Sequence, residues 1–348
     1  MRVMRVVVAP DSFGGTMTAP QAAAAIVRGW RDVAPYDDLD PVPLSDGGPG
    51  FVDVLHAGLG GRLVPVTVAD PLGRPVSGHV LVDGDTGYVE SAQACGLHLL
   101  APAERDLLRA DTRGVGQLVQ AAVAAGAARV VVGLGGSGTN DGGRGLWEEV
   151  GGRVDAELVA ATDVDNPLLG PNGASAVYGP QKGADRAMVL DLDDRLRAWA
   201  DEVEARLGRA GIRDLAGSGA AGGLGFALFA LGAQRRSGFE VVADAVALAA
   251  RVGTADLVLT GEGSFDAQSL RGKVPAGVAR LAQADGVPCV VVAGRAEVGR
   301  RDAAAAGVEE VHTVSELLGS DEAAVAAGAD GLAVVAAQVA RMWSPGPR

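Results

Sequence analysis

Four short apolar runs, each ending at glycine or at a polar turn, restrict the fold of this chain more than any other feature. They are RVVVA at 5–9, RVVVG at 129–133, LVLTG at 257–261 and CVVVA at 289–293. Their apolar residues are consecutive rather than alternating, which is typical of parallel strands covered by helices on both faces. Alanine-rich segments such as QAAAAIV at 21–27 favour such helices. We therefore predict an α/β fold.

The middle of the chain has a different pattern. Residues 61–91 alternate apolar and polar side chains, with turn signals at DPLGRP and DGDTG, which indicates antiparallel hairpins. A plain β-α-β order is confined to the two ends of the chain. We predict a Rossmann-like parallel-sheet domain built from both chain ends, 1–60 plus 246–348, and an inserted mixed α/β domain at 61–245.

Charge and composition narrow the possible partners. The formal net charge of −13 repels nucleic acid and anionic membrane surfaces, so neither is expected to bind. The two cysteines are far apart and have no CxxC spacing, which argues against a zinc site or a disulfide framework. The N-terminus does not read as a signal peptide, and the apolar runs are interrupted before the roughly 18 residues of a membrane span. We expect a soluble cytoplasmic protein and leave a homo-oligomer open.

Two common nucleotide motifs are not supported. GLGGSG at 133–138 has the spacing of a dinucleotide fingerprint, but the following TNDGGRGL interrupts the helix that should receive the pyrophosphate. A Walker A loop is not formed around Lys273, because Ala267 stands at the first glycine position and Val274 at the metal-binding Ser/Thr position. Neither NAD nor a P-loop is predicted.

Polar residues set between glycines follow several of the predicted strands. Such loops expose backbone amides that can surround an anion, and their carboxylates can bind a metal through oxygen. The carboxyl ends of parallel strands meet at one edge of a sheet, so we expect one ligand cleft there. The alternative is tight turns that need glycine for their dihedral angles. The candidates are Asp11, Ser12, Asp46, Gly47, Gly48, Gly135, Gly136, Ser137, Thr139 and Asn140, with Asp141 as a metal ligand.

Lysine is rare in this chain. Only two of the 30 basic residues are lysine, Lys182 and Lys273, and both lie in glycine-rich polar segments. A compact ammonium fits between phosphate oxygens where a planar guanidinium does not. The alternative is two leftover surface lysines. The segment LTGEGSFDAQSLRGK at 259–273 adds Glu262, Gly263, Asp266 and Ser269 after a further strand, whereas GSGAAGGLG at 217–225 fits either an anion loop or close helix packing.

Seven segments together resemble the glycerate kinase family, in its bacterial two-domain type that forms 2-phosphoglycerate. They are APDSF, SDGGPGF, GLGGSGTNDGG, DVDNPLLGPNGAS, YGPQKGA, GSGAAGGLG and LTGEGSFDAQSLRGKVPAGVA, and they follow the family order over nearly the whole chain. The resemblance implies ATP, Mg²⁺ and D-glycerate as ligands. Two positions depart from the family pattern: Gly14 stands where the family has lysine, and Pro49 where it often has glutamate.

Phosphoryl transfer depends on charge neutralisation and in-line positioning, and the candidate residues can be assigned accordingly. Glycine-loop amides, Lys182 and Lys273 would hold phosphate oxygens, and Asp141 or Glu262 would bind Mg²⁺. Asp266, or after it Asp46, would accept the proton of the substrate hydroxyl. Arg295 would pair with the glycerate carboxylate. Two other functions remain open, a kinase for a different small hydroxy acid and a ligand-binding or regulatory protein without efficient transfer.

Overall fold

A computed structural model describes residues 3–270 and 273–346, and the chain divides into two compact units. Unit 1 comprises Met1–Ser45 and Phe239–Arg348, and unit 2 comprises Asp46–Gly238. The observed boundaries follow Ser45 and Gly238, and the boundaries expected from the sequence, 60/61 and 245/246, both lie later in the chain than these. They differ because Phe51 packs its ring edge-on against Tyr88 within unit 2, with ring centroids 6.4 Å apart, and Phe239 packs within unit 1 against Gly277.

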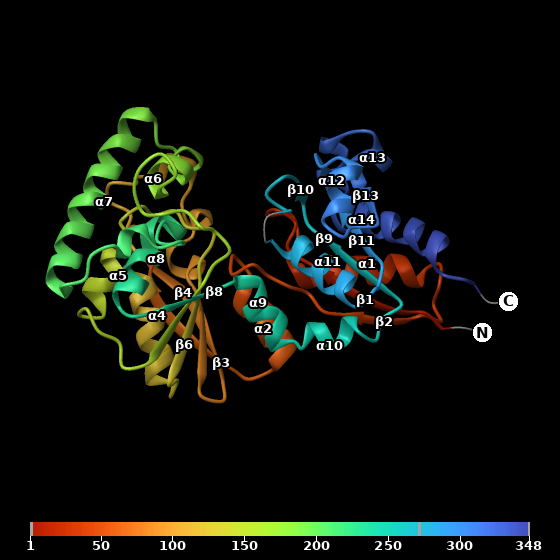
Figure 1. Cartoon of the computed structure of the whole chain (residues 1–348), viewed down its shortest axis with the longest axis horizontal. Coiled ribbons are helices and arrows are strands. Elements are labelled where there is room, and N and C mark those ends of the chain that lie inside the picture. Colours follow the sequence, from red (N-terminus) through yellow and green to blue (C-terminus); the bar gives the residue numbers. More distant parts are fainter. Residues whose placement is uncertain (1–2, 271–272, 347–348) are drawn as a thin grey trace. The chain divides into compact units, whose positions relative to one another are not determined.

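Unit 1 contains one five-stranded, fully parallel sheet (Figure 1). Its strand order is β13-β11-β9-β1-β2. The chain leaves β1 toward β2 on one side and continues through β9, β11 and β13 on the other, so the order reverses between β1 and β9. This is the doubly wound arrangement predicted for the two chain ends. The strands are β1 (Arg5–Pro10), β2 (Asp38–Pro41), β9 (Leu257–Gly261), β11 (Cys289–Ala293) and β13 (Glu310–Thr313).

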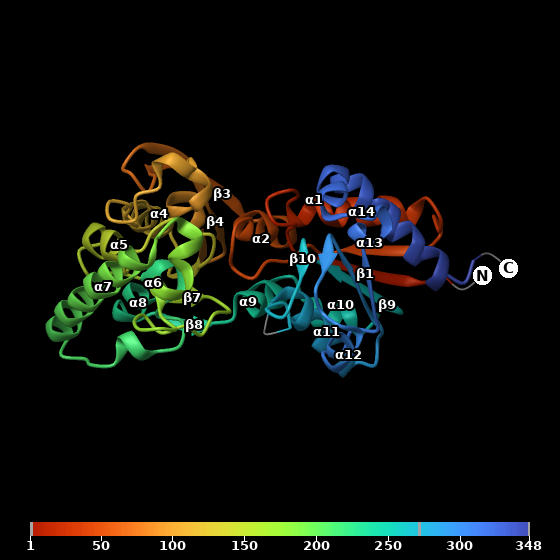
Figure 2. The ribbon, with the colours of Figure 1, turned by 90° about the horizontal axis from the view of Figure 1, so that it is seen from above.

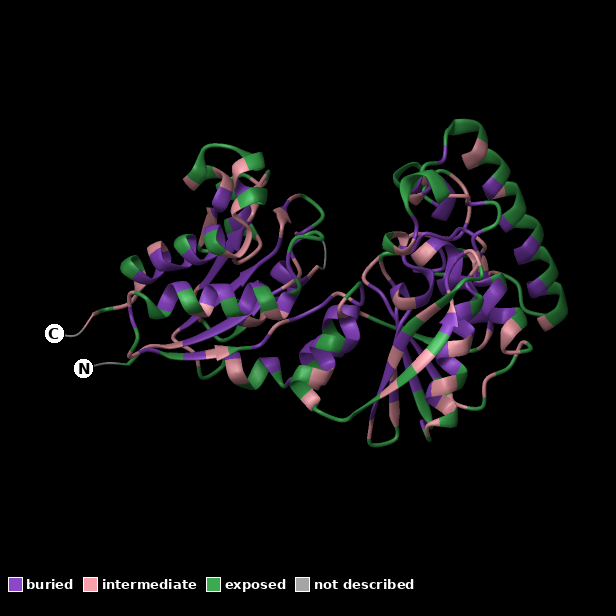
Figure 3. Cartoon of the chain, turned by 180° about the vertical axis from the view of Figure 1, so that it is seen from behind, coloured by how far each residue is buried: buried purple, intermediate pink, exposed green. Residues whose placement is uncertain are grey.

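Helices cover both faces of this sheet. Helix α1 (Ala19–Arg31) and helix α14 (Asp321–Trp343) lie side by side on one face, and α11 (Val274–Ala284) lies on the other (Figure 2). The three central strands β1, β9 and β11 are buried along almost their whole length (Figure 3). Helix α1 starts with a capping box, in which Thr18 accepts from the Gln21 amide and Gln21 accepts from the Thr18 amide. The shorter helices of unit 1 are α9 (Gly238–Ala245), α10 (Leu248–Val252), α12 (Arg300–Ala305) and α13 (Val314–Leu318).

Helix α14 is the one helix in residues 3–270 and 273–346 that is long and apolar enough to cross a membrane by length and composition: it has 23 residues, and an 18-residue window within it has a mean hydropathy of 1.6. Gly328, Asp330 and Gly331 interrupt its apolar residues, in line with the expectation that apolar runs are broken before that length. Leu332, Val335 and Val339 of this helix are nevertheless buried in the core that α14 forms with α1 and the sheet. The apolar composition of α14 is thus explained by its packing in unit 1.

Unit 2 is a mixed α/β domain, as predicted for the insertion. Its sheet has the order β3-β4-β5-β6-β7-β8; the first three strands are antiparallel and the last four are parallel. The two ends of this unit adjoin, because a Cβ atom on Gly238 would lie 1.9 Å from the carbonyl oxygen of Asp46. The strands are β3 (Arg62–Ala69), β4 (Pro75–Asp83), β5 (Thr86–Glu90), β6 (Arg129–Gly133), β7 (Glu157–Ala161) and β8 (Gln234–Arg236). The helices are α2 (Phe51–Leu59), α3 (Ala92–Cys95), α4 (Arg113–Ala124), α5 (Arg144–Glu149), α6 (Ala174–Tyr178), α7 (Arg186–Leu207) and α8 (Ala220–Ala230).

Candidate functional site

The strand ends at the reversal point of unit 1 place two acidic residues at neighbouring positions in the strand register. Pro10 of β1 pairs with Gly261 of β9, so the following residues, Asp11 and Glu262, occupy equivalent positions at the two strand ends. The Asp11 amide donates to the Gly261 carbonyl at 2.8 Å, and the Ser12 amide donates to Asp11 Oδ1 at 2.6 Å. Ligands of doubly wound sheets bind outside the strand ends at such a reversal point.

A two-stranded ribbon extends from these strand ends. It pairs β10 (Ser264–Phe265) with β12 (Arg295–Ala296), and the Arg295 amide donates to the Gly263 carbonyl at 3.1 Å. The Arg295 guanidinium donates through Nε to Ser264 Oγ at 3.1 Å, and its Nη1 lies 3.4 Å from Asp321 Oδ2. Arg295 therefore already has a carboxylate partner within unit 1.

The candidate base and the second lysine lie just beyond β10. Asp266 Oδ1 accepts from the amides of Gln268 at 2.7 Å and Ser269 at 3.3 Å, and Ser269 Oγ accepts from the Asp266 amide at 2.9 Å. These bonds close a tight turn. Half-buried Lys273 is the N-cap residue of α11, so its backbone lies at a helix N-terminus, where anions are favoured.

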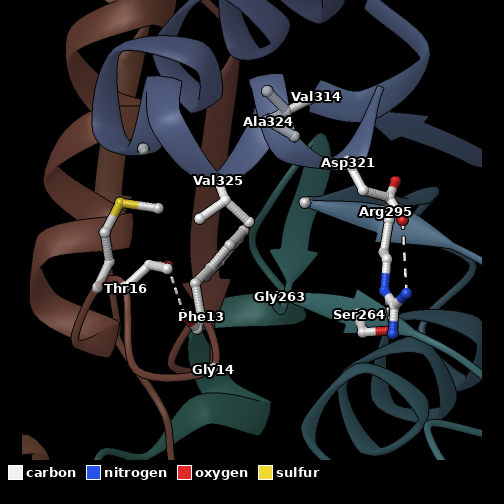
Figure 4. Close-up of a pocket in the computed structure, with 13 residues that line it drawn as sticks. Phe13, Gly14, Thr16, Gly263, Ser264, Arg295, Val314, Asp321, Ala324 and Val325 are labelled. Atoms are coloured by element: carbon white, nitrogen blue, oxygen red, sulfur yellow. Dashed lines mark hydrogen bonds and ion pairs between the residues drawn. The ribbon is translucent and has the colours of Figure 1, made fainter. Parts of the chain in front are cut away.

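A pocket of about 280 Å³ opens beside this ribbon within unit 1 (Figure 4). Gly14, Gly263 and Gly294 form part of its backbone lining, and Arg295 and Asp321 stand at its side. The other side chains that line it are mostly apolar. Gly14 and Gly263 follow β1 and β9, so this pocket lies beyond the carboxyl ends of those strands, whereas the candidates at 135–141 follow β6 of the other sheet.

In unit 2 the glycine loops pack directly on each other through their backbones. A Cβ atom on Gly135 would lie 2.5 Å from the Gly48 Cα, and one on Gly133 would lie 2.6 Å from the Gly47 carbonyl oxygen. Asp46 precedes these glycines, and its Oδ1 accepts from the Gly48 amide at 3.1 Å. The close contacts leave no space for side chains at these positions, so the loop after Ser45 and the loop after β6 pack directly against each other.

Lys182 is buried under the polar part of the second loop. Its Nζ donates to the Thr139 carbonyl at 2.7 Å, and its side chain comes from the 3₁₀ turn Pro180–Lys182. Burial lowers the pKa of Lys182 to about 8. The hydroxyls of Ser137 and Thr139 are 2.9 Å apart, and Asn140 donates to Ser175 Oγ at 2.9 Å. A buried ammonium and two buried hydroxyls thus belong to the same loop region, and their role in binding stays a prediction.

Asp141 is held by four hydrogen bonds from the protein itself. Its Oδ2 accepts from Thr112 N, Thr112 Oγ1 and Gly145 N at 2.8–3.0 Å, and its Oδ1 accepts from Gly143 N at 3.1 Å. Burial raises the pKa of the Asp141 carboxyl, and these donors oppose that effect. Within residues 3–270 and 273–346 no group of three or more His, Cys, Asp or Glu side chains could hold a metal ion. The four hydrogen bonds give Asp141 a role in bracing this loop, and metal binding by Asp141 stays a prediction.

The segment 217–225 packs against the loop after β6. Gly222 has φ +73°, and a Cβ atom there would lie 2.0 Å from the Thr139 carbonyl oxygen. A Cβ atom on Gly223 would lie 2.7 Å from the Gly142 Cα. The Gly142 amide donates a hydrogen bond to the Gly222 carbonyl at 3.1 Å. Of the two interpretations left open by the sequence, close packing is the one that these contacts support.

Sequence reasoning missed two contributors. Thr112 precedes α4 and binds Asp141 through both its amide and its hydroxyl, although no motif surrounds it. Asp321 reaches Arg295 from the start of α14. The only signal for the latter was a helical spacing, since Asp321, Ala324, Val325 and Gly328 all line the pocket.

Comparison with known proteins agrees with this architecture. The model of the glycerate kinase family matches residues 6–157 and 152–344. A glycerate kinase of Bacillus subtilis is 41% identical over 84% of this chain and 85% of its own length, and a glycerate 2-kinase of Escherichia coli is 38% identical over the same shares. The crystal structure of a Salmonella typhimurium LT2 protein assigned as glycerate kinase 2 superposes with a TM-score of 0.79, at 36% identity and 98% coverage of both chains.

The chain belongs to the glycerate kinase family. Membership of a kinase family implies small-molecule substrates, with ATP as the phosphate donor.

Proposed function

We propose that this protein is an ATP-dependent kinase that phosphorylates D-glycerate at its 2-hydroxyl, giving 2-phosphoglycerate. The observation that carries the proposal is the likeness to a glycerate 2-kinase of Escherichia coli, at 38% identity over 84% of the chain. Both lysines of the chain lie where an anion could be held, Lys273 at the N-terminus of α11 and Lys182 beneath the loop after β6. Phosphoryl transfer requires this kind of charge neutralisation.

Mg²⁺ would be held by Glu262 and Asp11 rather than by Asp141. Mg²⁺ commonly uses one or two protein carboxylates together with substrate phosphates, and these two residues follow paired positions of β9 and β1. Both oxygens of Asp141 already accept hydrogen bonds from Thr112, Gly143 and Gly145. When bound, Mg²⁺ would neutralise charge on the transferring phosphate.

Arg295 is a weaker candidate for the glycerate carboxylate than the sequence suggested. Its guanidinium lies 3.4 Å from Asp321 and 3.5 Å from Glu297, so a carboxylate ligand would compete with two acidic side chains. We assign the anionic ligand in unit 2 to Lys182, Ser137 and Thr139, together with the amides around Gly135 and Gly136.

The proposed substrate is tested by ADP release with D-glycerate and with a panel of other small hydroxy acids. Turnover with glycerate, and phosphorus NMR showing 2-phosphoglycerate, supports the proposal. Turnover only with another acid would assign a different hydroxy-acid kinase, an outcome prompted by Gly14. Binding of ATP and acid without turnover would indicate a regulatory relative.

Asp266→Asn should lower kcat about a hundredfold to ten-thousandfold if Asp266 accepts the hydroxyl proton. Asparagine keeps the Oδ1 acceptor that binds the Gln268 and Ser269 amides, so the turn should persist while the base is lost. Steady-state kcat at saturating ATP and glycerate is the measurement. Asp302→Asn, on an exposed helix end, is the matched control. Near-normal kcat in Asp266→Asn would transfer the role to Asp46.

A further inference from the structure

The pocket of unit 1 has an apolar wall that a small hydroxy acid does not explain. Phe13, Met17, Val314, Ala324 and Val325 line it (Figure 4). Glycerate carries a carboxylate and two hydroxyls, and burying them against such side chains would cost free energy unless each found a hydrogen-bond partner. The pocket therefore suits a flat, largely apolar part of a ligand.

One face of α14 forms part of this wall. Asp321, Ala324, Val325 and Gly328 are spaced as i, i+3, i+4 and i+7, so they lie along the same side of the helix. Val325 is 65% exposed, so its apolar side chain is accessible to a ligand in the pocket. Gly328, with φ +49°, interrupts the helix at the end of this face. The face thus has an apolar side chain available for contact.

The polar groups at the side of the pocket offer one acceptor and one donor. Asp321 provides carboxylate oxygens, and Arg295 provides guanidinium N–H groups (Figure 4). The edge of adenine presents an amino donor beside a ring-nitrogen acceptor, whereas the same edge of guanine presents two acceptors. The pair at this side therefore matches adenine and leaves Asp321 facing an acceptor if guanine binds.

We propose that this pocket holds the adenine base of the phosphate donor, a proposal that rests on the kinase function proposed above. Its volume of about 280 Å³ is close to the lower limit of roughly 300 Å³ for pockets that hold drug-sized ligands, so it takes a base and leaves the triphosphate outside. It lies beside the reversal point between β1 and β9, where doubly wound sheets bind nucleotides.

Filling the pocket should weaken nucleotide binding. Ala324→Leu adds volume inside the wall, and Ala326→Leu, on the exposed side of the same helix, is the matched control. We expect calorimetric Kd values for ADP and for adenosine to rise about tenfold in Ala324→Leu and to stay unchanged in Ala326→Leu. Adenosine isolates the base, because it has no phosphates. In wild-type protein ATP should exceed GTP in kcat/KM by about tenfold or more.

A second variant with its own control keeps the test decisive if Ala324→Leu does not fold. Val325→Asp changes an exposed side chain at the pocket, and Ala326→Asp is its control. Unchanged ADP and adenosine affinity in Val325→Asp and in folded Ala324→Leu would overturn the assignment, as would a rise in glycerate KM with constant ATP KM. If wild-type protein binds adenosine through this wall but never phosphorylates glycerate, the kinase proposal fails and the base pocket stands. If it phosphorylates glycerate and the variants bind ADP normally, the assignment of the base pocket fails and the kinase proposal stands.

Discussion

Replacing Lys182 by methionine should lower kcat/KM for phosphoryl transfer about a hundredfold to a thousandfold, because it removes a preorganised positive charge from a water-excluded loop. Methionine fills similar space, so the loss of folding stability should be confined to the hydrogen bond with the Thr139 carbonyl, about 1–3 kcal/mol. The measurement combines steady-state kinetics with thermal unfolding. A Lys182→Met enzyme of near-normal activity would remove Lys182 from the site.

The pH dependence separates this role from a structural one. Burial lowers the pKa of Lys182 to about 8 from 10.5, so the active ammonium is lost as pH rises through 8, and wild-type kcat/KM should fall above that pH. The contribution of Lys182 to folding stability changes in the opposite direction, rising as pH rises. Between these pH values the unfolded chain binds more protons at this group, so its contribution to the unfolding free energy rises with pH. Lys182→Arg should lose the alkaline decline, because guanidinium does not titrate there; a decline that persists in Lys182→Met would contradict the assignment.

Gly222→Ala should destabilise unit 2 by about 3 kcal/mol or more, corresponding to a Tm lower by about 10 °C. The new Cβ would lie 2.0 Å from the Thr139 carbonyl oxygen, at a backbone φ of +73° that L-residues avoid. Since that carbonyl also accepts from Lys182, activity should fall together with stability.

Gly208→Ala is the matched control for the backbone angle alone. Gly208 has φ +61° with no atom within 4 Å of an added Cβ, so alanine there incurs only the left-handed penalty of about 1–2 kcal/mol. Equal Tm losses in the two variants would show that the approach of Gly222 to Thr139 is not a constraint. Differential scanning calorimetry gives both values.

The fold was largely predictable because each of its main strands is marked by a pattern of apolar residues in its own local sequence. Consecutive apolar residues at 5–9, 257–261 and 289–293 identified the buried parallel strands, and alternation after residue 61 identified the hairpins of β3, β4 and β5. The unit boundaries were less accessible. Phe51 belongs to unit 2 through a ring contact with Tyr88, and nothing in the local sequence of α2 specifies which core it joins.

The site was predictable in its residue types and less so in its contacts. Glycine-flanked polar segments identified the loops, and the rarity of lysine singled out Lys182, which proved buried. What those groups touch depends on long-range packing. Asp141 accepts a hydrogen bond from Thr112, which lies 29 positions away, and its local sequence shows no sign of that contact. Asp321 is 26 positions from Arg295 and carries no motif. The catalytic and binding roles assigned from sequence remain predictions.

The close approach of Gly238 to Asp46 has a consequence for how the gene can be divided. Residues 46–238 form one uninterrupted stretch whose first and last residues adjoin, so we expect this stretch to tolerate excision or circular permutation with a short linker. Expressed by itself, it should give a cooperative melting transition and resist proteolysis. Unit 1 would then need only a short peptide to join Ser45 to Phe239. With this arrangement, unit 2 could be gained or exchanged as a single continuous segment of the gene.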